Sequence, residues 1–416
     1  MMNDKMTVAV IGGGASGMMA ALTAAEDPDC RVVLLERQQR VGRKLLATGN
    51  GRCNLTNTGA APENYHGDDP AFAESVLGKF TPRDTLDFFH GLGLLTVEEY
   101  GGRAYPLSNA ANSVVDVLRF ALEAAGVEVR TACPVRELRR ERSGGYTLLL
   151  DGGSLYAQRV IVACGGAAGA KLGGVTDGYE LLKPLGHKRT RLLPSLVQLL
   201  TDPEYPRALK GVRAEVRMRL LSGDELLGES RGALQFTETG VSGPAAFDLS
   251  RLAAETGEGA RLSMDFFDGY SQEELLELLR RRCERFPALE CGELLTGMLH
   301  NRLGRMLGKY CGLNAALPLS GLDEAALARV AAAGKAFPLV LRGTEGFDSA
   351  QVTHGGIRTA GFDPETLESW FMPGLFVCGE LLDIDGDCGG YNLQWAWASG
   401  YIAGKNAALR EKKNVE

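Results

Sequence analysis

The 416-residue sequence has few aromatic residues, no excess of positive charge and no long apolar run. Phe, Trp and Tyr make up only 7% of it, and no stretch of 18 or more apolar residues occurs, which argues against a transmembrane helix. Its formal net charge of −7 argues against a general nucleic-acid binder. No basic segment followed by a long apolar core stands near the start, so we expect no signal peptide and no membrane partner.

Cysteine pairs with the spacing of a metal or redox site are also missing. Nine cysteines are spread along the chain, and none of them forms a CxxC pair. An odd number without such spacing disfavours a disulfide framework, a zinc ribbon and a CxxC redox centre. We therefore expect reduced thiols, no metal site and a cytoplasmic protein.

Glycine is abundant instead, at 54 of 416 residues against an average near ~7%. The apolar run 7–11 meets a glycine turn, a helical segment follows, and a second apolar run ends at Glu36. The turn reads Gly12-x-Gly14-x-x-Gly17, and Glu36 stands nineteen residues after its last glycine. Gly14 lets the backbone approach a diphosphate, the helix N-terminus offers N–H groups to it, and Glu36 can accept hydrogen bonds from ribose hydroxyls. This βαβ unit predicts a dinucleotide site.

The fingerprint does not separate FAD from NAD, but the C-terminal segment favours FAD. An apolar strand at 374–380 ends at Glu380, where a carboxylate can hold a ribityl hydroxyl. The Gly-Gly-Tyr-Asn-Leu turn at 389–393 then opens a helix, whose N-terminus would stabilise negative charge developing on a flavin ring. The acidic loop between them could bind calcium, but Cys388 stands where an EF-hand loop needs glycine.

A third block, GRKLLATGNGRCNLTN at 42–57, combines cations, amides and glycines in one loop. It follows Glu36 closely, so it predicts a polar, cationic loop beside the expected diphosphate. No second GxGxxG follows a strand and leads to an acidic residue, so a nicotinamide donor would have no separate site of its own.

Together, Gly12–Gly17 with Glu36 and the blocks at 42–57, 236–245, 352–359 and 379–400 resemble a known family. It is the bacterial NAD(P)/FAD-dependent oxidoreductase family that includes the bile-acid-inducible flavoprotein reductase and aminoacetone oxidase-like flavoproteins. The resemblance covers nearly the whole chain. It implies an α/β fold: a Rossmann-like FAD-binding domain of the glutathione/fumarate-reductase type, with an inserted β-barrel and helical region.

The domain division expected on this basis is discontinuous. Residues 1–193 and 347–416 would form the FAD-binding domain, because every cofactor motif lies there. Residues 194–269, whose apolar and polar positions alternate, would form an inserted β-rich domain. Residues 270–346 would form an inserted helical region, with helices predicted at 271–286, 293–310 and 323–335.

The resemblance also implies which residues hold non-covalent FAD. The pyrophosphate and adenosine end would be bound by Gly12, Gly14, Ala15, Gly17, Glu36, Arg37, Arg43, Lys44 and the backbone of Val135. The ribityl chain and the flavin would be bound by Gly49, Asn54, Leu55, Glu380, Asp387, Asn392 and Leu393. Cys53 and Cys388 lie in the same blocks and leave covalent attachment of flavin open as an alternative.

The implied activity is reduction of an activated C=C bond, as in a 3-oxo steroid or bile-acid-like enone, by hydride transfer through flavin N5. His354 lies in a glycine-rich loop and is the candidate proton donor, with a structural loop histidine as the alternative. An amine or aminoketone oxidase needs the same cofactor and stays open, as does a flavin-binding protein that acts with a partner. We expect a small-molecule substrate, no nucleic acid, and NAD(P)H as a candidate transient donor; the oligomeric state is not set by the sequence.

Overall fold

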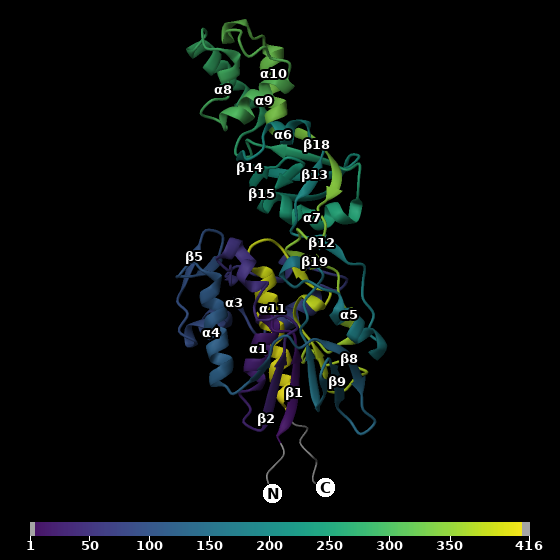
Figure 1. Ribbon diagram of the computed structural model, residues 1–416. Coiled ribbons are helices and arrows are strands. Elements are labelled where there is room, and N and C mark those ends of the chain that lie inside the picture. Colours follow the sequence, from purple (N-terminus) through teal and green to yellow (C-terminus); the bar gives the residue numbers. More distant parts are fainter. Residues whose placement is uncertain (1–4, 410–416) are drawn as a thin grey trace. The chain divides into compact units, whose positions relative to one another are not determined.

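The computed structural model describes residues 5–409, and they divide into two compact units. The first unit combines the chain up to Leu193 with the chain from Gln351 onward, and the second is Pro194–Ala350. Figure 1 shows the purple and yellow ends of the chain side by side in the first unit. Strand β12 (Leu193–Ser195) lies where the chain passes from the first unit to the second.

A five-stranded parallel sheet forms the centre of the first unit, in the order β20-β11-β1-β2-β7. In the register of β1, Val10 is paired with Leu34 on one side and with Ile161 on the other. Strands β1, β11 and β20 are mostly apolar and buried, because a parallel sheet is covered on both faces. Their bounds are β1 (Met6–Ile11), β2 (Cys30–Leu35), β7 (Glu128–Arg130), β11 (Arg159–Val162) and β20 (Leu375–Val377).

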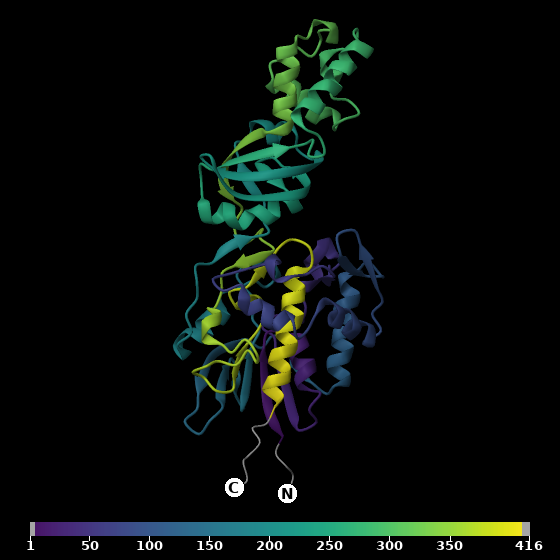
Figure 2. The ribbon, with the colours of Figure 1, turned by 180° about the vertical axis from the view of Figure 1, so that it is seen from behind.

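Helices from the two ends of the chain, α1 (Ala15–Ala24) and α11 (Tyr391–Ala408), pack closely against each other (Figure 2). The small residues at the contact allow this approach. A Cβ on Gly400 would lie 2.4 Å from the Ser16 carbonyl oxygen, and one on Gly404 would lie 2.4 Å from that of Ala20. A larger side chain at either glycine would therefore push the helices apart.

Smaller elements complete the first unit around this sheet. The sheet order is β10-β9-β8 in one group, β3-β6-β5 in another, and β21 with β4 in a third. The helices are α2 (Ala71–Leu77), α3 (Pro82–Gly91), α4 (Ala111–Ala124) and α5 (Asp177–Leu182). The strands are β3 (Thr56–Asn57), β4 (Tyr65–His66), β5 (Thr96–Glu99), β6 (Arg103–Pro106), β8 (Val135–Arg140), β9 (Tyr146–Leu150), β10 (Gly153–Ala157), β19 (Val352–His354) and β21 (Asp385–Gly386).

The second unit contains a closed six-stranded barrel, in the order β13-β16-β15-β14-β17-β18. Alternate residues point inward, as Val216, Met218 and Leu220 do on β14. The last barrel strand, β18, follows the helical region in the sequence, although we expected 270–346 to be helical. The strand bounds are β13 (Leu199–Thr201), β14 (Arg213–Ser222), β15 (Glu225–Phe236), β16 (Gly240–Ser242), β17 (Arg261–Asp265) and β18 (Phe337–Thr344).

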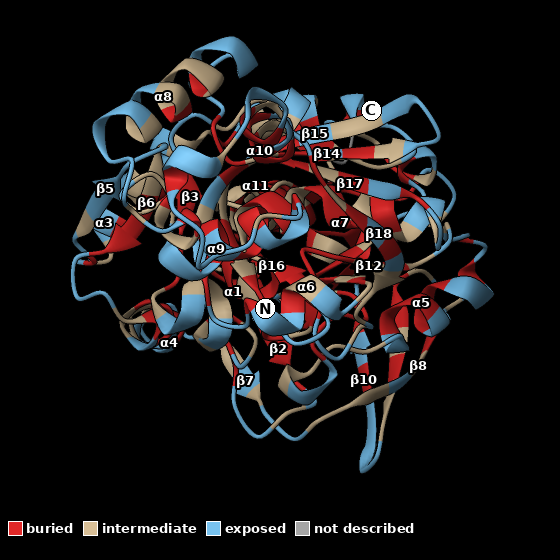
Figure 3. Cartoon of the chain, turned by 90° about the horizontal axis from the view of Figure 1, so that it is seen from above, coloured by how far each residue is buried: buried red, intermediate tan, exposed pale blue. Residues whose placement is uncertain are grey.

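The helices of the second unit are α6 (Glu204–Ala208), α7 (Pro244–Thr256), α8 (Gln272–Arg285), α9 (Asn301–Tyr310) and α10 (Glu324–Lys335). Helix α8 begins at a capping box, in which Ser271 and Glu274 bind each other's backbone N–H groups, as its sequence predicts. Figure 3 shows α8 with exposed and intermediate residues along most of its length, and its buried residues are Leu275 and Leu279.

Two predictions of secondary structure in this unit agree with the structure only in part. The helix expected over 293–310 begins only at Asn301, because Gly297 has a φ of +84° and the His300 side chain accepts the Arg302 N–H as a cap. The segment expected to be β-rich contains the thirteen-residue helix α7, which starts with Pro244 at its first turn.

The buried histidine of the first unit, His187, is enclosed by aromatic rings. Its ring stacks on Phe362 and lies against Phe371, with 4.5 Å between ring centroids in both cases. The Ser369 hydroxyl lies 3.1 Å from His187 Nε2. Burial lowers the pKa of His187 to about 4, because the charged imidazolium would lose its hydration.

We predict that this histidine destabilises the fold in acid. Between pH 6.5 and about 4 the unfolded imidazole takes up a proton that the folded one does not, so the free energy of unfolding falls as pH falls through this window. Between pH 7 and pH 4, the free energy of unfolding measured in urea should fall by ~2–3 kcal/mol more for the natural protein than for H187Q. The exposed-histidine variant H90Q serves as the control, and equal pH dependence in H187Q and the natural protein would contradict the prediction.

Candidate functional site

The three glycines of the N-terminal fingerprint differ in what surrounds the position of a Cβ atom. Gly12 has a φ of +110°, and a Cβ there would lie 2.4 Å from the Ala163 carbonyl oxygen. A Cβ on Gly17 would lie 1.9 Å from the Gly12 carbonyl oxygen, so this glycine brings α1 close to the turn. Gly14 is different, because its Cβ position meets nothing within 4 Å. The backbone at Gly14, followed by Ala15 at the N-terminus of α1, therefore borders open space.

Glu36 lies just after β2, beside the glycine turn, and is 9% exposed. Its Oε2 accepts a hydrogen bond from the Gly13 N–H and its Oε1 accepts one from the Gln38 N–H, both at 2.7 Å. The Glu36 carbonyl oxygen accepts the Cys133 N–H, which places the segment leading to Val135 next to Glu36. The structure thus brings the glycine turn, Glu36 and the neighbourhood of Val135 together.

The three cations predicted at the site all have polar partners. Arg37 pairs with Asp177 at 3.3 Å, and Arg43 donates to Gln38 Oε1 at 2.8 Å. Lys44 makes a 2.7 Å ion pair with Glu380.

Glu380 connects the N-terminal block with the C-terminal block. One of its oxygens receives Lys44, and the other accepts the Thr353 N–H at 2.9 Å. The Thr353 hydroxyl in turn accepts the Ala168 N–H, in the glycine-rich segment after β11. Blocks that are far apart in the sequence are therefore held around one carboxylate.

Asn54 carries a buried polar atom without a partner. Among the residues described, its Oδ1 is buried and makes no hydrogen bond. The Cβ positions of Gly49 and Gly390 would lie 3.1 Å from the Asn54 N and 3.0 Å from its Oδ1, so glycines on both sides leave space around this residue. An unpaired buried acceptor is costly and is expected at a place where a ligand supplies the donor.

Leu55 and Cys53, next to Asn54, are placed differently from what we expected of a ligand-binding loop. Leu55 is wholly buried, its N–H donates to the Ala104 carbonyl and its carbonyl accepts the Trp397 indole N–H. Its side chain and backbone are therefore used by the fold. Burial raises the pKa of the Cys53 thiol to about 12, which makes it a poor nucleophile for covalent attachment of a flavin.

The turn before α11 is fixed by Asn392. Its Oδ1 accepts the Gly386 N–H at 2.9 Å and its Nδ2 donates back to the Gly386 carbonyl at 2.7 Å. Gly390, with a φ of +102°, is the N-cap, and Leu393 is partly buried in the first turn. The Asn392 side chain thus shapes the turn, and the backbone N–H groups of the first helical turn stand at the positive end of an 18-residue helix.

Two aspartates of the acidic loop pair with histidines from other segments. One member of each pair, His354 in one and Asp387 in the other, was predicted from the sequence to be a site residue. His354 Nδ1 lies 2.7 Å from Asp385 Oδ1, and His66 Nε2 lies 2.7 Å from Asp387 Oδ1. Asp387, predicted at the flavin, also accepts a hydrogen bond from Asn64. The alternation of aspartates at 383, 385 and 387 was the available signal, because alternate residues of an extended segment point to one face.

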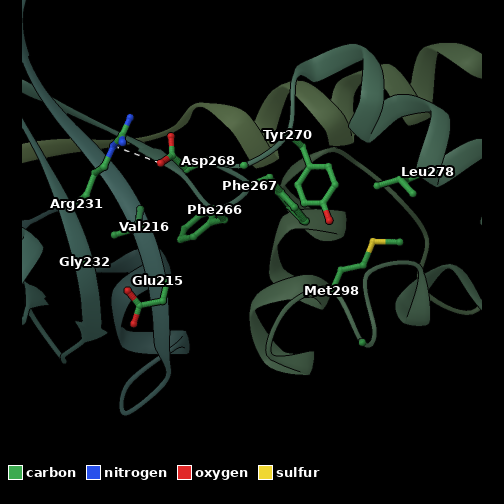
Figure 4. Close-up of a pocket in the computed structure, with 12 residues that line it drawn as sticks. Glu215, Val216, Arg231, Gly232, Phe266, Phe267, Asp268, Tyr270, Leu278 and Met298 are labelled. Atoms are coloured by element: carbon green, nitrogen blue, oxygen red, sulfur yellow. Dashed lines mark ion pairs between the residues drawn. The ribbon is translucent and has the colours of Figure 1, made fainter. Parts of the chain in front are cut away.

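The second unit has a cavity of its own, of about 610 Å³. Figure 4 shows Phe266, Phe267 and Tyr270 on one connecting segment, with the ion pair of Arg231 and Asp268 at the barrel side. None of the residues predicted to bind the cofactor lines it. The candidate site therefore consists of residues of the first unit alone.

Residues 5–409 contain neither a membrane-spanning helix nor a metal-binding cluster. No helix in this range has the length and apolar character that crossing a membrane requires. In the same range, no group of three or more His, Cys, Asp or Glu side chains could hold a metal ion.

Comparison with known proteins shows similarity along the whole chain. The family described as HI0933-like protein Rossmann domain matches residues 6–406. A Clostridium scindens protein named 3-dehydro-bile acid delta(4,6)-reductase is 40% identical over 407 residues, covering 97% of this chain and 99% of the relative. An Escherichia coli protein named ribosomal RNA dihydrouridine synthase is 29% identical over 412 residues, covering 97% and 98%.

A solved structure shares the fold. It is that of 3-ketosteroid-delta4-(5alpha)-dehydrogenase from Rhodococcus jostii RHA1 in complex with 4-androstene-3,17-dione. The TM-score is 0.50 at 17% sequence identity, and the match covers 97% of each chain.

We predict that Asn54 is kept for binding rather than for stability. In cofactor-free protein, N54L should leave the free energy of unfolding unchanged or raise it by up to ~1 kcal/mol, because it removes a buried unpaired acceptor. The matched control is N57L, which breaks hydrogen bonds from Asn57 to the carbonyls of Gly101 and Gly389 and should cost ~1–3 kcal/mol. Urea unfolding measures both, and an N54L loss as large as that of N57L would contradict the prediction.

Proposed function

We propose a function for this chain from the premise that it belongs to the family of the HI0933-like protein Rossmann domain and is an FAD-dependent oxidoreductase. The match confirms the resemblance inferred from the sequence. When bound, FAD supplies a ring that accepts and donates hydride through N5. We propose that the chain uses this cofactor to reduce a C=C bond conjugated to a carbonyl group in a small organic molecule.

The residues of the first unit fit FAD, with features that a cofactor would complete. Open space at Gly14 stands at the N-terminus of α1, where backbone N–H groups favour a diphosphate. The unpaired Asn54 Oδ1 would receive a donor from the ligand. Glu36 has two hydrogen bonds to backbone and further lone pairs for ribose hydroxyls.

We propose the following assignment on this basis. The diphosphate would be surrounded by Gly12, Gly14, Ala15, Gly17, Arg43 and Lys44. The adenosine would be bound by Glu36, Arg37 and the backbone of Val135. Glu380 would hold the ribityl chain, and Gly49, Asn54, Asp387 and Leu393 would border the flavin. Asn392 would act through the turn that its side chain fixes, and Leu55 through its place in the core.

The names of two relatives support the reduction of a C=C bond conjugated to a carbonyl group. A 3-dehydro bile acid with delta(4,6) bonds has its C=C bonds conjugated to the 3-oxo group. Dihydrouridine is uridine whose ring C=C bond, conjugated to a carbonyl, has been saturated. Both names therefore describe the same change at an enone-like bond. The 40% identity to the first relative favours an apolar 3-oxo substrate of steroid type.

The chain's own contribution to the reaction is a proton. Saturating an enone adds hydride to the carbon remote from the carbonyl and a proton to the carbon beside it. His354 Nδ1 is bound to Asp385 at 2.7 Å, and the next residue, Gly386, is bound by Asn392 in the first turn of α11. We propose that His354 Nε2 gives this proton. The hydrogen bond between Nδ1 and Asp385 keeps the imidazole in one orientation during this step.

A uracil base in RNA is the second candidate substrate, and the length of the match to the Escherichia coli relative favours it. It needs the same hydride and proton, so the two candidates differ in recognition and not in chemistry. Reduced nicotinamide is the proposed donor, and it would use the same face of the cofactor in turn with the substrate.

The test is reoxidation of the reduced holoenzyme under anaerobic conditions. Protein reduced by NADH, NADPH or dithionite is mixed with a 3-oxo-delta4 steroid, with uridine-containing RNA, or with oxygen. We predict that the steroid restores the oxidised flavin spectrum with loss of its own enone absorbance, and that H354Q slows this step ~10²–10⁴-fold. Reoxidation by RNA but not by steroid would select the second candidate. Reoxidation by oxygen alone would contradict C=C reduction.

A further inference from the structure

The two histidine–aspartate pairs meet at one small ribbon, made of β4 and β21. His66 and Asp385 belong to the ribbon, Asp387 follows β21, and His354 is the last residue of β19. Asp385 is the cross-strand partner of His66 in its antiparallel register. Asp383, Asp385 and Asp387 alternate along the segment, whereas Ile384 between them is buried in the core. Each of the three carboxylates has its own partner: Asp383 accepts the Asp68 N–H, Asp385 faces His354 and Asp387 faces His66.

Asp385 is the most enclosed carboxylate of the two pairs. Its side chain is 2% exposed, against 29% for Asp387. A carboxylate taken out of water at this depth is stabilised as an anion only when a cation or several donors face it. His354, with a 15% exposed side chain, stands 2.7 Å away.

The other groups around the pair carry charges of both signs. Asp383 is buried, and burial raises its pKa; its nearest charges are Asp68, His354 and Asp385. Asp68 is bound by Arg358. The segments next to the pair carry further titratable and charged groups. The acidic ones are Asp383 and Asp68, and Asp387 is paired with His66. The arginines are Arg358, and Arg189 and Arg191 on the segment that pairs with residues 356–357.

We propose that Asp385 is the positioning residue of this site, which fixes His354 through Nδ1 and keeps its ring protonated at neutral pH. The inference rests on the proposed function, in which His354 Nε2 donates a proton. In that step the Nε2–H bond breaks, a C–H bond forms with the electron pair of the enolate carbon, and the imidazolium becomes neutral. The ring regains its proton from water before the next turnover. Asp385 stays a carboxylate throughout and does not itself touch the substrate.

The first test reads protonation directly in the holoenzyme. The chain has five histidines, so each ¹³C-labelled histidine ring signal can be assigned by single substitution. In D385N the titration midpoint of His354 should move to lower pH by about 1–2 pH units, because an amide carries no charge. D265N is the matched control, since Asp265 forms a half-buried 2.7 Å ion pair with Lys335 in the second unit. It should leave the His354 titration in place.

The second test reads the pH profile of reoxidation of the reduced enzyme by the 3-oxo-delta4 steroid. D385N should lose ~10–100-fold in rate at pH 8 and much less at pH 5.5, where His354 is protonated without help. D385E, which restores the charge, should recover most of the rate at pH 8. A role in folding alone would lower the rate equally at both pH values.

The two claims can fail separately. If no enone is reduced but the His354 titration moves in D385N, the reaction is wrong and the role of Asp385 is supported. If the enone is reduced and neither the titration nor the pH profile of D385N differs from the natural protein, the role of Asp385 is overturned. A rate loss that is independent of pH, without a moved titration, overturns it as well.

Discussion

The Glu380 carboxylate is the interaction on which the architecture of the site depends. It stands 2.7 Å from Lys44 and accepts the Thr353 N–H at 2.9 Å. It therefore joins three glycine-rich blocks, and Lys44 and Glu380 themselves are 336 residues apart in the sequence. A partly buried carboxylate needs both partners to offset the loss of its hydration. The 42–57 block follows β2 and Glu380 follows β20 of the same sheet, whereas Thr353 lies on β19, which pairs with β12. Glu380 connects the three.

The rest of the site follows from close backbone packing in the first unit. Gly12 and Gly17 bring α1 to the ends of β1 and β11, and Gly400 and Gly404 bring α11 onto α1. This packing aligns two helix N-termini in one unit, while Gly14 keeps the space beside one of them open. The unpaired oxygen of Asn54 shows the cost of such an arrangement, since a fold selected for stability alone would not bury it.

Local signals in the sequence predicted the elements that carry the cofactor motifs. The βαβ unit with Glu36, the strand before Glu380 and the helix that starts at Ser271 were all predicted, because each depends on residues within a few positions of one another. The barrel could be expected from the family resemblance, but the place of β18 in it could not. Its closure depends on pairing with β13 and β17, strands that are distant in the sequence.

Long-range contacts explain what the sequence did not reveal at the site. His66 lies in a short segment without a motif, and only its pairing with β21 brings it to Asp387. Leu55 stands inside a polar block, yet its burial follows from contacts with Ala104 and Trp397. The hydrogen bonds of the Asn392 side chain to Gly386 were not predicted, because they depend on the path of the chain at Gly386.

The central claim is that residues from both ends of the chain form one FAD site, with Glu36 at its adenosine end. Its most direct test is the dissociation constant of FAD for E36A, measured by titrating apoprotein, with the exposed-residue variant E137A as control. The account predicts that E36A raises the dissociation constant ~5- to 150-fold, the equivalent of ~1–3 kcal/mol, because a buried charged acceptor is lost. The spectrum of the flavin that does bind should stay unchanged. An E36A dissociation constant equal to that of E137A would contradict the account.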